Sequence, residues 1–196
     1  MRTSLWIVLL TLFSFNSAHA LGLNFGLKVG HEMFNSNILG SPEGAPSTFL
    51  AMGELDLSVI NLEINLGSHS SFIVAPQSGK TEFVNQEFAV AAIARLSLPI
   101  VPKVLSFDIG GGLDQRILMG QYLAANEKTN AQASGSRTML PISAQIAVNV
   151  PVVKFYLETR FNVELNNSLS FGGFAGIPDE ELGANHELWI LGGIAF

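Results

Sequence analysis

Hydrophobic and polar residues alternate with a period of two along most of the chain after residue 20. In residues 21–33, for example, Leu23 and Phe25 fall on one face, whereas Asn24 and Lys28 fall on the other. Such alternation is typical of a β-strand whose two faces meet different surroundings. Eight runs of this kind predict eight strands, at residues 21–33, 48–57, 61–73, 86–98, 103–118, 139–150, 153–165 and 184–196.

The connections between these runs alternate in length. Three are tight, at 58–60, 99–102 and 150–152, and four are long and contain Gly, Ser, Asn or Pro, at 35–47, 74–85, 119–138 and 166–183. Short turns at one end and long loops at the other are typical of hairpins in outer-membrane β-barrels. The pattern places both chain ends at the short-turn end, which is periplasmic in such barrels.

Alternation alone does not decide which face points inward, because a soluble periplasmic barrel with a ligand cavity has the same period. Most runs reach the roughly 9–11 residues that a tilted membrane strand needs, whereas soluble strands are typically about 5–6 residues long. All eight apolar faces are rich in Leu, Phe and Ile, which favours an outer surface in lipid. Because hydrocarbon tolerates no unpaired strand edge, the sequence predicts an all-β, closed, antiparallel, up-and-down transmembrane barrel of eight strands.

Residues 1–20 have the features of a cleaved secretory signal peptide. Arg2 is followed by an apolar stretch over residues 5–15 and then by Ala18 and Ala20, which are spaced as in a cleavage site. An N-terminal membrane anchor is the alternative, but the apolar stretch is short for a membrane span. We therefore expect the signal peptide to deliver the rest of the chain across the inner membrane.

The barrel domain is expected to cover residues 21–196. Without Arg2 it carries nine Lys and Arg against sixteen Asp and Glu, a net charge of −7 that argues against nucleic acid as a partner. Charged residues make up only 13% of the chain, about half of the usual fraction. The absence of cysteine excludes a lipoprotein anchor, disulfides and a cysteine metal site.

The polar faces of the runs predict a charged barrel interior. An eight-stranded barrel is about filled by its own side chains, so these charges must pair or form hydrogen bonds. Nine acids and four bases fall on the predicted inner face, and Trp189 joins them as a candidate plug. The charged residues are Lys28, Glu54, Asp56, Glu63, Glu87, Arg95, Asp108, Asp114, Arg116, Glu158, Arg160, Glu164 and Glu187.

Glycines interrupt two of the predicted strands, at 110–112 and at 192–193. A glycine within a strand marks a bulge, a bend or the close approach of another group. We expect these glycines to serve the curvature of a small barrel, since no phosphate-binding motif surrounds them.

The last run ends on Phe196 and resembles the C-terminal recognition signal of bacterial outer-membrane proteins. The whole of 21–196 is similar in architecture to the small eight-stranded outer-membrane β-barrels, the class that includes the transmembrane domain of outer membrane protein A. No short motif points to one subfamily. The resemblance implies a place in the outer membrane of a Gram-negative bacterium, contact with its lipid, and insertion by the barrel-assembly machinery through the C-terminal strand.

Candidate catalytic residues are few. A serine hydrolase needs Ser, His and an acid within reach of one another, and the only candidates are His69 with Ser68, Ser70 or Ser71, and His186 beside Glu187. Some barrels of this class are lipid A deacylases or palmitoyltransferases, but the flanking pattern of the deacylase motif is absent. We expect no enzyme and no cofactor.

A metal site is a further candidate at the long-loop ends of the first and last strands. These strands are neighbours in a closed barrel, so His31 and Glu32 could meet His186 and Glu187 and bind a divalent cation. Polar residues at strand ends are far more often simply solvated, and we predict no metal here.

The long loops are therefore the candidate sites of function. Loop 166–183 carries Leu169, Phe171, Phe174 and Ile177 among glycines, which can cover the barrel mouth or bind a partner, and the polar loop 119–138 is a second candidate site for an extracellular ligand. We expect a structural or surface-interaction role. The alternatives are a narrow pore for small or hydrophobic solutes, with cations favoured by the acidic lumen, and a lipid-modifying enzyme.

Overall fold

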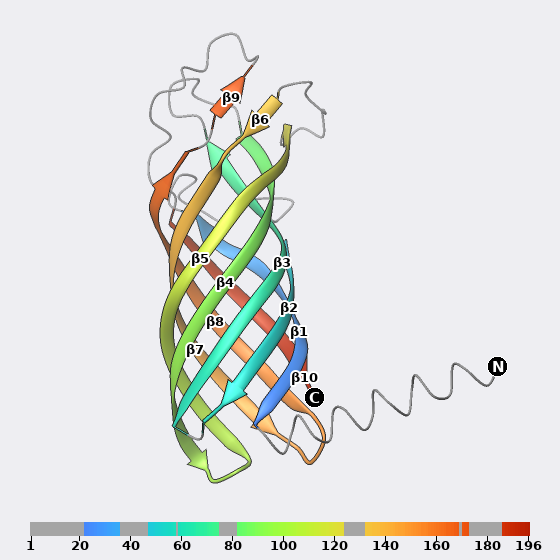
Figure 1. Ribbon diagram of the computed structural model, residues 1–196, viewed down its shortest axis with the longest axis vertical. Coiled ribbons are helices and arrows are strands. Elements are labelled where there is room, and N and C mark those ends of the chain that lie inside the picture. The colour runs from blue at the N-terminus through green and yellow to red at the C-terminus, as the bar shows by residue number, and fades with distance from the viewer. Residues whose placement is uncertain are drawn as a thin grey trace, which may run out of the picture.

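The computed structural model describes residues 22–35, 47–57, 59–74, 82–123, 132–168, 170–172 and 186–196. The predicted signal peptide at 1–20 lies outside these residues. Eight long strands surround one lumen (Figure 1). They are β1 (Leu23–Asn35), β2 (Ser47–Asp56), β3 (Ile60–Val74), β4 (Glu82–Val101), β5 (Leu105–Leu123), β7 (Ser136–Asn149), β8 (Lys154–Asn167) and β10 (Glu187–Ala195). No helix in the described part of the chain is long and apolar enough to cross a membrane.

Each barrel strand pairs antiparallel with its neighbours, in the order β1-β10-β8-β7-β5-β4-β3-β2. The sheet closes where β1 meets β10, and two backbone hydrogen bonds between Phe25 and Phe196, of 3.0 and 2.9 Å, continue that pairing to the last residue. The predicted fold class and all eight predicted strands are thereby confirmed. The 20 residues of β4 and the 19 of β5 exceed the predicted runs and extend mainly at the long-loop end.

Two short strands outside the barrel were not expected. The sequence predicts 119–138 and 166–183 as loops, but β6 (Gln132–Ser134) and β9 (Ser170–Gly172) form a separate two-stranded antiparallel sheet between them. Three residues are too few to give a recognisable alternation. The small sheet lies beyond the long-loop end of the barrel (Figure 1) and joins two segments that are far apart in sequence.

The polarity of the barrel is inverted relative to a soluble protein. All six Lys and Arg residues of the barrel strands are buried, whereas large apolar side chains such as Phe49, Ile64, Leu113 and Leu157 are about half exposed on the outside. Exposed Leu, Ile, Val and Phe side chains occur on all eight strands. An apolar outer band around a polar interior is the arrangement of a membrane-spanning barrel.

The glycines allow close approach rather than bulging. A bulge would appear as a shift in strand register. Within the described pairings, such shifts lie away from both glycine runs, for example between Thr138 and Met139. Gly110 pairs with Arg95, and a Cβ atom at Gly110 would come within 2.5 Å of the Arg95 Cγ. A Cβ at Gly193 would likewise come within 2.7 Å of the Cγ of its partner Lys28. Both glycines therefore leave room for long cationic side chains to cross the lumen.

We expect Leu113→Arg to lower the free energy of unfolding in phospholipid vesicles by about 2–4 kcal/mol, because the charge would face hydrocarbon. Val152→Arg is the control, since Val152 is 70% exposed in the short turn between β7 and β8, and it is expected to change that free energy by at most about 1 kcal/mol. Denaturant titration of both variants gives the comparison. Equal effects of the two substitutions would contradict the inverted polarity.

Candidate functional site in the barrel lumen

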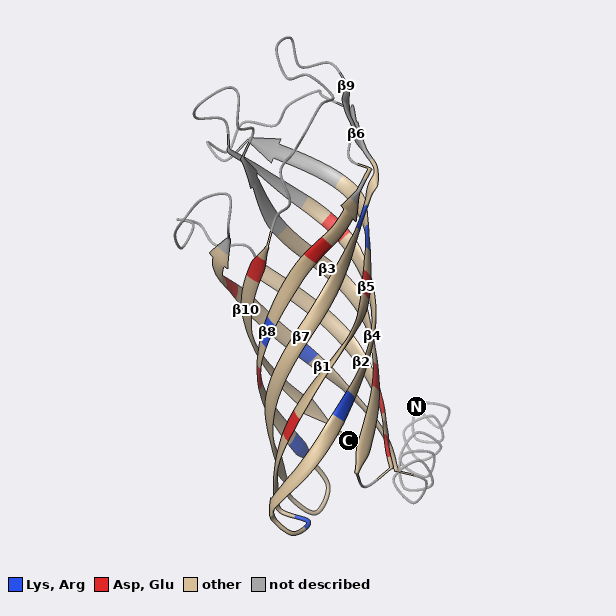
Figure 2. Ribbon diagram, turned by 90° about the vertical axis from the view of Figure 1, so that its left-hand side faces the viewer, with Lys and Arg blue, Asp and Glu red and all other residues tan. Residues whose placement is uncertain are grey.

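The structure places twelve of the thirteen charged residues predicted for the inner face at buried positions in the lumen. The exception is Asp56, whose side chain is 39% exposed at the short-turn end of the barrel. Figure 2 shows that acidic and basic residues are spread along the height of the barrel rather than gathered at one end. The interior is therefore charged throughout, and its ion pairs form three clusters.

Three further charged residues are buried in the lumen, namely Glu32, Arg137 and Lys154. Arg137 was missed because the predicted strand began two residues later, at the end of the predicted loop 119–138. Lys154 was overlooked although it has the same alternation as Tyr156 in its own strand, and Glu32 was considered only as a metal ligand. With these three, six bases face nine buried acids among the described residues.

The basal cluster lies nearest the short-turn end and is centred on Glu54. The Tyr156 hydroxyl donates to Glu54 Oε2 at 2.9 Å, and the Lys154 ammonium forms an ion pair with the same carboxylate. Lys154 Nζ also lies 3.9 Å from Asp56. Two cations lie over the Tyr156 ring, with Lys28 Nζ at 5.1 Å and Lys154 Nζ at 5.3 Å from its centroid, distances at which the ring attracts a cation.

The central cluster is built on two carboxylates, Glu63 and Glu158, which share three cations. Lys28 Nζ lies 2.8 Å from Glu63 and 2.7 Å from Glu158. Arg95 bridges the same two carboxylates at 2.5 and 2.8 Å. Arg160 Nε donates to Glu158 at 2.8 Å, and its Nη2 lies 3.6 Å from Glu63. These side chains come from β1, β3, β4 and β8, so the cluster ties strands on different sides of the barrel together.

The upper cluster is centred on Glu187, near the long-loop end. Its carboxylate accepts hydrogen bonds from Arg116 at 2.8 Å, Arg137 at 2.9 Å and the Trp189 indole at 3.0 Å. His69 Nε2 lies 3.3 Å from the same carboxylate. The other acids of this cluster form ion pairs with Arg116 or Arg137. They are Glu87, Asp114 and Glu164.

Apolar side chains close the lumen between the central and upper clusters. Trp189 is 1% exposed and packs with Leu50 and Leu191. Its ring lies against the His69 ring, with 4.1 Å between centroids. Trp189 therefore faces the lumen, as the alternation predicts.

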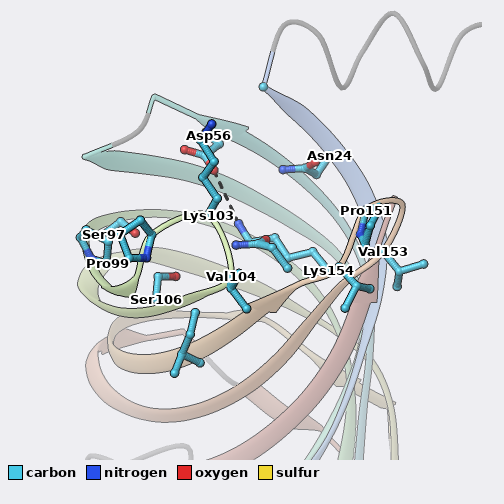
Figure 3. A pocket seen from close by; sticks show the side chains of 15 residues that line it. Asn24, Asp56, Ser97, Pro99, Lys103, Val104, Ser106, Pro151, Val153 and Lys154 are labelled. Atoms are coloured by element: carbon cyan, nitrogen blue, oxygen red, sulfur yellow. Dashed lines mark ion pairs between the residues drawn. The ribbon is translucent and has the colours of Figure 1, made fainter.

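The short-turn end of the barrel, by contrast, opens into a cavity of about 700 Å³. Asn24, Asp56, Lys103 and Lys154 line it, and Figure 3 shows the Asp56–Lys154 ion pair inside it. The cavity reaches the basal cluster from the short-turn end. Asp56 and Lys154 belong to that cluster, and Asn24 contacts it.

The candidate catalytic groups do not assemble. His69 faces the lumen, whereas Ser68 is exposed on the outside and Ser70 shares that outer face by alternation; the Ser71 side chain lies outside the described residues. His186 is half-buried, with its ring centroid 6.3 Å from that of Phe161. The acid that His69 meets is Glu187, which is 118 residues away in sequence.

The structure does not bring His31 and Glu32 together with His186 and Glu187, the arrangement that the alternative of a metal site would need. Neighbouring residues of a strand face opposite sides, so His31 is exposed on the outside while Glu32 is buried inside. The register of β1 and β10 sets His31 opposite Ile190. Among the described residues, no three His, Asp or Glu side chains gather as metal ligands would.

Comparison by sequence finds no matching protein-family model and no matching curated protein. Comparison by structure finds eight-stranded barrels of bacterial outer membranes. Neisserial surface protein A (NspA) matches with a TM-score of 0.55 and 13% identity, over 89% of this chain and 97% of that chain.

Two further solved structures have lower TM-scores. The N-terminal β-barrel domain of Pseudomonas aeruginosa OprF matches with 0.46 and 11% identity, over 88% of this chain and 97% of that one. Ail, the attachment invasion locus protein of Yersinia pestis, matches with 0.45 and 11% identity, over 89% and 96%. The similarity to NspA, together with the closed strand order and the inverted polarity, shows that this chain has the fold of the eight-stranded outer-membrane β-barrels.

Proposed function

We propose that this protein is a non-conducting barrel of the outer membrane that acts through its long loops, as a structural or surface-interaction protein. The observation that carries the proposal is the filled lumen. Ion pairs and Trp189 occupy the space through which a solute would pass, and moving ions past them would require breaking buried pairs, each at a cost of several kcal/mol.

The proposal includes the route to the membrane. Residues 1–20 act as a signal peptide that is cleaved, and residues 21–196 insert as one domain. The outward-facing Phe196 side chain, next to the buried Ala195, supports a role for the last strand as the segment that the barrel-assembly machinery recognises. The charges of the lumen have a structural role in this account, since they hold opposite walls of the barrel together.

The surface role rests on the two loops that β6 and β9 join. Pairing of β6 with β9 holds one described part of the segment 119–138 against one described part of the segment 166–183. We place the extracellular ligand, lipid or protein, at these two segments. No catalytic step is proposed, because His69 contacts Glu187 inside the lumen and has no serine beside it on that face among the described side chains.

A narrow pore is the second candidate function. The observation that favours it is the excess of nine acids over six bases in the described lumen, which would make any open path selective for cations.

Planar bilayers containing the purified barrel separate these two functions. We expect no stable single-channel steps, because the central cluster and Trp189 fill the lumen. A general porin reconstituted in the same membranes is the control for successful insertion. Stable steps with cation selectivity would overturn the plugged barrel in favour of the narrow pore.

Cysteine labelling tests the orientation on which the surface role depends. The sequence contains no cysteine, so each introduced cysteine gives an unambiguous signal. Ser168→Cys, at the exposed long-loop end of β8, is expected to react with a membrane-impermeant maleimide on intact cells. Val152→Cys, in a short turn, is expected to react only after the outer membrane is permeabilised. The opposite order of labelling would place the loops in the periplasm and remove the proposed role.

A further inference from the structure

A small cavity lies where the central and upper clusters face each other inside the barrel. Its volume is about 10 Å³, close to the minimum that holds one water molecule. Asp114 and Arg116 of β5 line it, as do Arg160 and Asn162 of β8. Trp189 and Leu191 are among the residues that complete its wall. The cavity therefore lies at the level where the apolar side chains close the lumen.

Each of the four polar residues contributes one atom without a hydrogen-bond partner among the described residues. These atoms are Asp114 Oδ1, Asn162 Oδ1, Arg116 Nη2 and Arg160 Nη2. All four residues are at least nine-tenths buried. An unsatisfied buried polar group costs about 1–3 kcal/mol, and more if it is charged, so four of them on residues that line one small cavity require an explanation.

Three of these side chains, Asp114, Arg116 and Arg160, are held by ion pairs, so their unsatisfied atoms are not free to turn away. Asp114 Oδ2 accepts from Arg116 Nε at 2.9 Å, and Arg116 Nη1 donates to Glu187 at 2.8 Å. Arg160 Nε donates to Glu158 at 2.8 Å, whereas Arg160 Nη2 lies 3.6 Å from Glu63, beyond hydrogen-bond length. The ion pairs therefore fix the positions of the atoms that remain on Asp114, Arg116 and Arg160, and Asn162 Oδ1 is the fourth unpartnered atom.

The chemistry of the four atoms identifies the ligand that fits. Two are acceptors, on Asp114 and Asn162, and two are donors, on Arg116 and Arg160. A water molecule offers two donors and two acceptors and complements such a set. Chloride offers no donor and would lie beside the Asp114 carboxylate, and a metal cation would lie beside two guanidinium groups. Neither ion satisfies all four atoms.

We propose that this cavity is a binding site for one ordered water molecule, which bridges Asp114 and Arg116 to Arg160 and Asn162. The water joins the central and upper clusters into one hydrogen-bonded network through the level that the apolar side chains close. It is a component of the plug, and the inference stands whether or not the loops have the proposed surface role.

A crystal structure of the barrel grown with bromide in place of chloride tests the site directly. We expect one density peak within hydrogen-bond distance of Asp114 Oδ1 and Arg116 Nη2, with no anomalous signal from bromide. An anomalous peak at that place would overturn the proposal in favour of an anion site. Absence of any density in a map that shows other ordered waters would also overturn it.

Cross-relaxation between water and protein, measured by NMR in detergent micelles, gives an independent test. Protons of Trp189 are expected to receive magnetisation from a long-lived water in the unmodified barrel. Ala91→Val places extra volume in the cavity wall and is expected to abolish that signal. Ala92→Val is the matched control, because Ala92 is the next residue of β4 and is exposed on the outer face.

The unmodified barrel alone can contradict the proposal, so the test does not depend on the folding of Ala91→Val. No signal at Trp189 in the unmodified protein would show that the cavity holds no long-lived water. A signal that persists in a folded Ala91→Val barrel would place the water elsewhere. Loss of the signal in Ala92→Val as well would remove the link to the cavity.

Discussion

Pairing of buried charges is the interaction on which the rest of this barrel depends. Side chains about fill the interior of an eight-stranded barrel, and an ion removed from water loses several kcal/mol of hydration that only close partners and hydrogen bonds can restore. Glu158 illustrates the solution, since Lys28, Arg95 and Arg160 all contact it within 2.8 Å. Loss of one carboxylate would leave several cations short of a partner, so each cluster stands or fails largely as a unit.

The same pairing of charges keeps the apolar side chains on the outer face of the barrel. Because successive residues of a strand face opposite sides, a slip of one residue would turn every charge toward lipid. Side chains that cross the lumen therefore fix the register of all eight strands, and the inward glycines at 110 and 193 give Arg95 and Lys28 the space to do so. A lumen filled by paired charges in this way supports the proposal that the long loops, rather than the lumen, carry the function.

Alternation in the sequence predicted the eight strands and the face of almost every charged residue, because both follow directly from the period of two. It did not predict which charges meet. Lys28 and Glu158 are 130 residues apart, and their contact depends on strand order and register. Arg137 was missed at a strand boundary, where a loop-like composition hid the alternation. His31, which the alternative of a metal site would have turned toward the last strand's residues, faces outward instead, because proximity of strand ends does not fix the face of each side chain.

Substitution of Glu158 tests the central claim most directly. Glu158→Gln keeps the shape of the side chain but removes the charge that three cations share, and we expect the free energy of unfolding in phospholipid vesicles to fall by about 3–5 kcal/mol. Asp56→Asn, at a partly exposed ion pair of 3.9 Å, is expected to lower it by no more than about 1 kcal/mol. Similar small losses in both variants would contradict the account, since the barrel would then be held together by something other than its buried charges.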